Sequence, residues 1–146
     1  MNETAAQLIW IGHLAGTLYM TGLIWFVQCV HYPLMGRVAT ERYVDYQESH
    51  MRRTGWVVAP AMLLEAFTAA ALLYVRPDIL SFAMALTNFG MLLLIWVSTA
   101  ALQVPCHNRL VRGFDPVMHG RLVRSNWIRT ILWTARAILL LSVLWF

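Results

Sequence analysis

Charge is scarce in this sequence, and lysine is missing altogether. Only 12% of its 146 residues are charged, about half of what a soluble domain normally carries. Hydrophobic residues make up 60% of the chain, and its mean hydropathy is +0.60. This composition excludes an ordinary soluble domain and predicts a single integral-membrane domain spanning residues 1–146.

Cysteine motifs and an N-terminal basic segment are also lacking. The two cysteines, Cys29 and Cys106, do not form a metal-binding CxxC pair, so we expect both to be free. No basic residue precedes the first apolar run, which is therefore expected to be retained rather than cleaved as a signal peptide. All 11 basic residues are arginines and the net charge is +4. We assign this excess to cytoplasmic loops, not to a nucleic-acid partner.

Long apolar segments are what the sequence does contain. They predict helices at about 5–35, 41–75, 79–104 and 116–146, each long enough to cross a bilayer. The expected fold is all-α, a four-helix transmembrane bundle. Thr40 and Asp115 are the expected N-caps of the second and fourth helices, Pro60 is expected to kink the second, and Pro105 to bend the end of the third.

Arginines gather in two of the three connections, around residues 36–53 and 107–124. The positive-inside rule places both connections in the cytoplasm and both chain termini outside. The expected location is the inner membrane of a bacterium. Membrane lipids are the expected surroundings, and a homo-oligomer is possible.

A weak internal repeat relates the two halves of the chain. Gln28 is followed by Arg53-Thr54, and Gln103 is followed at nearly the same distance by Arg129-Thr130. The pattern favours two repeated helical hairpins, although chance agreement is an equal alternative at so few positions.

Glu65 and Arg136 are the most informative residues, because a charge inside a membrane is costly and usually faces the bundle interior. Each lies about 15 Å along its helix from the membrane entrance. They are the only opposite charges at that depth, so we predict that they pair. Such a pair could fix helix register or take part in function.

A second polar cluster is expected nearer the cytoplasm. The fourth helix carries polar side chains at the spacing of one helical face, and the other three helices have polar residues at a matching level. The residues that we expect to face one another are Gln28, His31, Tyr32, His50, Arg53, Gln103, His107, Asn126, Arg129 and Trp133.

Three of these residues are histidines, and they could bind a metal. His31, His50 and His107 come from three segments and match no compact ligand motif, so hydrogen bonding to loops is the simpler alternative. His13 lies too far along the first helix to join them. It could be a haem ligand by itself, although no second histidine is expected at its depth.

Two motifs resemble a known family. "VPCHNRL" (104–110) and "NWIRT" (126–130) are similar to the paired signature of the small four-helix membrane proteins grouped with the fungal anthrone oxygenases. His107 stands where asparagine is common in that family. The resemblance implies a membrane-embedded site for a hydrophobic, polycyclic or quinone-like compound, centred near Pro105, His107, Asn126 and Arg129.

The leading expectation is a membrane oxidoreductase acting on a lipophilic aromatic or quinone-like substrate. His50 or His107 would move protons, Asn126, Gln103 and Arg129 would hold oxygen atoms, and Glu65–Arg136 would close the floor of the pocket. The expected catalytic residues are therefore His50, Glu65, His107, Arg129 and Arg136. The alternatives are a haem- or metal-binding membrane protein and a transporter or lipid-binding subunit.

Overall fold

The computed structural model describes residues 3–144, which fold into four long helical rods without any strand. The first rod is α1 (Glu3–Phe26), the π-helix η1 (Val27–His31) and α2 (Tyr32–Met35); the second is the 3-10 helix η2 (Thr40–Arg42) and α3 (Tyr43–Leu72). The third is α4 (Phe82–Ser98), the π-helix η3 (Thr99–Gln103) and α5 (Val104–Leu110), and the fourth is α6 (Pro116–Ser142). The expected all-α class is confirmed.

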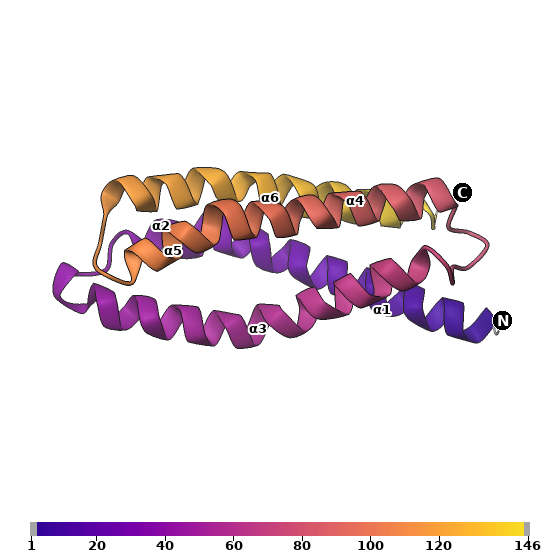
Figure 1. Cartoon of the computed structure of the whole chain (residues 1–146), viewed down its shortest axis with the longest axis horizontal. Coiled ribbons are helices and arrows are strands. Elements are labelled where there is room, and N and C mark those ends of the chain that lie inside the picture. The colour runs from indigo at the N-terminus through magenta and orange to yellow at the C-terminus, as the bar shows by residue number, and fades with distance from the viewer. Residues whose placement is uncertain (1–2, 145–146) are drawn as a thin grey trace.

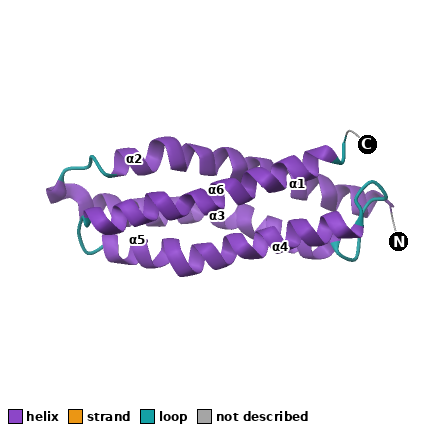
Figure 2. Cartoon of the chain, turned by 90° about the horizontal axis from the view of Figure 1, so that it is seen from above, coloured by secondary structure: helices purple, strands orange, loops and turns teal. Residues whose placement is uncertain are grey.

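The rods lie side by side and run alternately in opposite directions (Figures 1 and 2). The two chain ends and the α3–α4 connection lie at one end of the bundle. The α2–α3 and α5–α6 connections lie at the other end, which we call the arginine end. Pro60 lies within α3, and α3 bends along its length (Figure 1).

Three of the four rods, Glu3–Met35, Thr40–Leu72 and Phe82–Leu110, are long and apolar enough to cross a membrane. Among the described residues, α6 does not reach that hydropathy, so the expectation of four such segments is met by three. The reason is that α6 carries Asn126, Arg129 and Arg136 within its apolar half.

Polar and apolar side chains are distributed as expected for a protein in lipid. Large apolar side chains cover the outside, such as Trp56 at 79% exposed and Phe67 at 73%. His13, Glu65 and Arg136 are fully buried. Apolar side chains on the outside and ionisable ones on the inside are the distribution expected of helices that face lipid.

The prediction that the third helix ends at residue 104 is wrong. The rod passes through Pro105 and continues to Leu110. Directly before it, the backbone N–H of Val104 donates to Thr99 O, which widens the helix into a π turn. A wider turn relieves the clash between a proline ring and the preceding turn. The first rod repeats this device, since Tyr32 N–H donates to Val27 O just before Pro33.

The π-helices also correct the register of the proposed repeat. Each ends two residues before its proline, but Gln28 is the second residue of η1 and Gln103 is the last residue of η3. The two glutamines are therefore not equivalent positions.

The second rod ends at Leu72 rather than 75, and the third begins at Phe82 rather than 79. In the connection, Arg76 Nη1 donates to Leu73 O at 3.2 Å, and Ser81 Oγ accepts from Met84 N–H to cap α4. The longer turn thus has its own hydrogen bonds. The last described helix ends at Ser142, and the predicted end at 146 lies outside the described residues.

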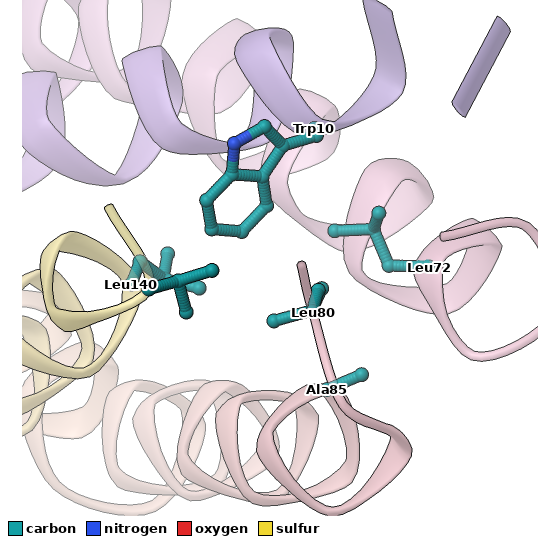
Figure 3. Packing of buried hydrophobic residues seen from close by; sticks show 6 residues of the cluster. Trp10, Leu72, Leu80, Ala85 and Leu140 are labelled. Atoms are coloured by element: carbon teal, nitrogen blue, oxygen red, sulfur yellow. The ribbon is translucent and has the colours of Figure 1, made fainter. Parts of the chain in front are cut away.

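Three apolar layers follow one another along the bundle. The layer near the chain ends contains Trp10, Leu72, Leu80, Ala85, Leu140 and Val143, and all four rods or their connections contribute to it (Figure 3). The middle layer contains Met20, Ile24, Met62, Ile95 and Trp133. The layer at the arginine end contains Tyr32, Met35, Tyr43, Cys106, Leu110 and Leu122. Polar side chains occupy the levels between these layers.

One of the two expected helix caps is present. Asp115 accepts hydrogen bonds from the backbone N–H groups of Val117 and Met118 at 3.0 and 3.1 Å. Thr40 instead begins the 3-10 turn η2, and α3 has Arg42 as its N-cap, with no side-chain hydrogen bond at that cap within residues 3–144. The prediction for Thr40 is therefore wrong, because the 3-10 turn moves the start of α3 past it.

These caps predict different responses to alanine. Asp115→Ala should lower the free energy of unfolding by about 1 kcal/mol because two backbone donors lose their acceptor. Thr40→Ala should change it by less than about 0.5 kcal/mol. Thermal unfolding of both variants in the same detergent measures the difference, and equal effects would contradict the cap assignment.

Candidate functional site

The predicted pairing of Glu65 with Arg136 is confirmed. Arg136 Nη1 lies 2.7 Å from Glu65 Oε1, and both side chains are 0% exposed. Thr17 Oγ1 donates to the same oxygen at 3.0 Å. Trp133 Nε1 lies 3.3 and 3.1 Å from the two carboxylate oxygens. The carboxylate therefore has donors from α1 and α6.

His13 joins this pair, a contact that was not predicted from the sequence. Arg136 Nε donates to Asn88 Oδ1 at 2.9 Å, which turns the amide nitrogen of Asn88 toward His13 Nε2 at 2.8 Å. The ring must therefore accept at Nε2 and carry its proton on Nδ1, which lies 2.8 Å from Thr68 Oγ1. The Thr68 hydroxyl in turn donates a hydrogen bond to Leu64 O at 2.6 Å.

We call these seven side chains the ion-pair network; its members are His13, Thr17, Glu65, Thr68, Asn88, Trp133 and Arg136. All four rods contribute to it, and apolar layers lie on either side. Because both charges are paired and the donors find acceptors, the network is a closed structural unit. The sequences of α1 and α4 do not identify His13 and Asn88 as partners of the ion pair. Neither residue carries a charge that would have to be compensated inside the bundle.

The second site is a cavity of about 230 Å³ between the middle layer and the arginine end. Its walls are mainly apolar, from Met20, Ile24, Val58 and Met62 among others. Five of the residues predicted from the sequence line it, and they are Tyr32, His50, Gln103, His107 and Arg129. Val104 in its lining is 44% exposed, so the cavity reaches the surface beside α5.

The three histidines do come together, but not as metal ligands. The rings of His31 and His50 stack with centroids 4.4 Å apart, and His50 lies 5.6 Å from His107. Within residues 3–144, no group of three or more His, Cys, Asp or Glu side chains is arranged to hold a metal ion. In stacked imidazole rings the nitrogen atoms do not point toward one common position. The three histidines are therefore not arranged to coordinate one metal ion.

The two histidines of the cavity differ in their hydrogen bonds. Both nitrogens of His107 are engaged, with Gln47 Nε2 at 2.9 Å and Tyr32 Oη at 3.1 Å. His50 Nδ1 lies 3.0 Å from Thr54 Oγ1. Among the described hydrogen bonds none uses His50 Nε2, so His50 is the ring free to exchange a proton with a ligand.

Arg129 is the cation of the cavity. Its guanidinium carbon lies over the Trp133 ring, 5.4 Å from the ring centroid, which is a cation–π contact. Its Nε is buried, and no acceptor in the described part of the chain reaches it. Arg129 thus differs from Arg136, whose charge is fully paired.

Two predicted binding residues have structural contacts instead. Asn126 Nδ2 donates to Gln28 Oε1 at 2.8 Å, and Gln28 Nε2 donates to Val123 O at 3.3 Å. These bonds tie η1 to α6 and lie outside the cavity lining. Gln103 Nε2 donates to Ser125 Oγ at 3.0 Å and thereby ties η3 to α6. Unlike Gln28 and Asn126, Gln103 also lines the cavity.

The remaining predicted residues also lie outside the cavity. Arg53 is exposed on α3, because the face that it shares with Trp56 turns outward. Glu65, Arg136 and Trp133 are not part of the cavity lining. Trp133 belongs to the middle layer, whose members Met20, Ile24 and Met62 do line the cavity. The expected floor of the pocket is therefore apolar, with the ion-pair network beneath it.

The chain matches no protein-family model, no curated protein and no solved structure. The resemblance to the anthrone oxygenases therefore stays a prediction.

Breaking the ion pair should be strongly destabilising. Glu65→Leu leaves the Arg136 charge buried without its partner, so the free energy of unfolding should fall by about 3–5 kcal/mol. Glu48→Leu, at an exposed position of the same helix, should change it by less than about 0.5 kcal/mol. Adding Arg136→Met to Glu65→Leu should restore part of the loss in detergent melting curves. A double variant no more stable than Glu65→Leu would contradict the pairing.

Two glycines of α1 give a second test. A Cβ at Gly16 would lie 3.3 Å from Glu65 Cγ, and the network prevents Glu65 from moving away. Gly16→Ala should therefore destabilise the protein by about 1–3 kcal/mol. Gly12 has open space around its Cα, so Gly12→Ala should stabilise α1 by up to about 1 kcal/mol. Chemical denaturation in mixed micelles would show opposite signs.

Proposed function

We propose that this chain is an integral membrane protein that binds a lipophilic aromatic or quinone-like molecule in the cavity and moves a proton at that molecule. The observation that carries this proposal is the cavity lining. An apolar enclosure with a few convergent polar groups is the usual form of a small-molecule site, and here His50, His107 and Arg129 meet in one.

The polar groups suit a molecule that bears an oxygen atom at one end. Arg129 and Gln103 offer N–H groups that would hold this oxygen, while the apolar wall from Met20 to Met62 would cover the rings. His50 has a ring nitrogen, Nε2, that no described hydrogen bond uses, and imidazole is the side chain that most often moves protons in proteins. His107 is held by Tyr32 and Gln47, so its role is to support the wall and orient Tyr32.

An oxidoreductase is the enzyme class that best fits this proposal. Reduction of a quinone to a quinol takes up two electrons and two protons; a separate electron donor would supply the electrons, and His50 would pass the protons to the quinone oxygens. The charges of the ion-pair network are already paired within the described chain. This pairing fits a structural role for the network better than a role in transport.

We place the arginine end of the bundle in the cytoplasm, with all four rods crossing the membrane. Arg37, Arg42, Arg109 and Arg112 lie in or beside its two connections, as the positive-inside rule requires. The cavity then lies in the cytoplasmic half of the bilayer. Its exposed lining at Val104 would admit a ligand sideways from the lipid.

Blocking the cavity tests this proposal. Gly55 lines the cavity and has open space at its Cα, so Gly55→Leu places a side chain where the ligand would lie. Equilibrium binding of 1,4-naphthoquinone to detergent-solubilised protein should weaken by about tenfold or more, equivalent to about 1.4 kcal/mol. Gly90→Leu is the matched control, since Gly90 is also helical, has open space and lies outside the cavity.

His50→Ala should leave naphthoquinone affinity within about threefold while slowing the reduction of the bound quinone to its quinol by added dithionite, because that step takes up two protons. Equal naphthoquinone binding by wild type, Gly55→Leu and Gly90→Leu would overturn the proposed site.

A further inference from the structure

Arg129 has no counter-ion among residues 3–144. The two ion pairs among the described residues are Arg109–Asp115 and Arg136–Glu65, and the cavity lining includes no acidic side chain. A guanidinium does not lose its proton in proteins. The cavity therefore carries a positive charge that the folded chain itself leaves uncompensated.

From this charge we infer that the ligand binds as a monovalent anion, an ionised organic acid of one or two aromatic rings, with its anionic oxygens on Arg129. The inference rests on the proposed function, since it specifies the ligand of the same cavity. It distinguishes an ionised acid from a neutral quinone, which would leave the Arg129 charge without a counter-ion.

The geometry around Arg129 favours a planar anionic group. The Arg129 guanidinium carbon lies over the Trp133 ring, 5.4 Å from its centroid, so the ring occupies one side of the guanidinium and a ligand would reach its N–H groups from the other side. Its buried Nε has no acceptor in residues 3–144. Edge-on N–H groups match the spacing of carboxylate oxygens and form paired, charge-assisted hydrogen bonds with them.

The size of the cavity limits the apolar part of the ligand. An apolar protein cavity of about 150 Å³ is large enough to hold benzene, and the cavity here is about 230 Å³. One aromatic ring or two fused rings fit that volume. The surrounding Met20, Ile24 and Met62 side chains would contact their faces.

The other cavity groups are compatible with one negative charge and not with more. Gln47 Nε2 points at His107 Nδ1, so the uncharged His107 ring holds its single proton on Nε2 toward Tyr32. The Arg129 guanidinium is then the one fixed charge in the lining. A dianion would bring an uncompensated charge into an apolar enclosure, which is costly.

Three probes of similar shape test the inference: 2-naphthoate, its neutral amide 2-naphthamide, and 1,4-naphthoquinone. At pH 7 wild-type protein in detergent should bind naphthoate more tightly than naphthamide by about thirtyfold or more. Arg129→Gln should remove this preference by weakening naphthoate binding alone. Arg129→Lys should keep most of it, and it provides a folded charged variant if Arg129→Gln is unstable. Arg124→Gln, an exposed arginine of the same helix, should have no effect.

The outcomes separate this inference from the proposed function. If naphthoquinone or naphthamide binds as tightly as naphthoate and the Arg129 variants do not discriminate among them, the anion inference is wrong and the cavity is still a ligand site. If naphthoate preference persists in Arg129→Gln, the anion binds elsewhere and the inference is also wrong. If none of the three probes binds wild type more tightly than Gly55→Leu, the proposed function itself fails.

Discussion

The pairing of Glu65 with Arg136 is the contact on which the rest of the bundle depends. In an apolar surrounding each charge alone would be strongly unfavourable, so the four rods can assemble only in the arrangement that brings the two together. Thr17, Asn88 and His13 then complete their hydrogen bonds. The network thus sets rotation and register for every rod, whereas apolar packing alone tolerates many alternatives.

The cavity, in contrast, contains an arginine whose charge is not paired within the described chain. Arg136 has its charge paired, while Arg129, two turns away on the same helix, has a buried Nε without an acceptor. Buried polar groups in native proteins are normally satisfied, so an unsatisfied cation in a cavity points to a partner outside the chain. In the proposed function the two arginines of α6 have different roles: the paired Arg136 holds the rods together, and the unpaired Arg129 holds the ligand.

Much of this could be predicted from the sequence, and the failures have physical causes. Glu65 and Arg136 were predictable as partners because they are the only opposite charges at their depth. His13 and Asn88 were not, because uncharged polar residues carry no comparable energetic demand. The continuation of the third rod past Pro105 depends on a π turn, which no residue pattern specifies. Arg53 shares its spacing with inward residues but lies on the face that turns outward.

Trp133 links the two levels of the bundle. Its indole N–H donates to Glu65, and its ring face lies beneath the guanidinium of Arg129. The hydrogen bond holds the ring in place, and the ring lies against the Arg129 guanidinium. In the proposed site, the ion pair therefore acts on the position of Arg129 through a single rigid side chain. A charge buried for stability thus orients the charge that is free to bind, which accounts for two arginines on one face of α6 with such different surroundings.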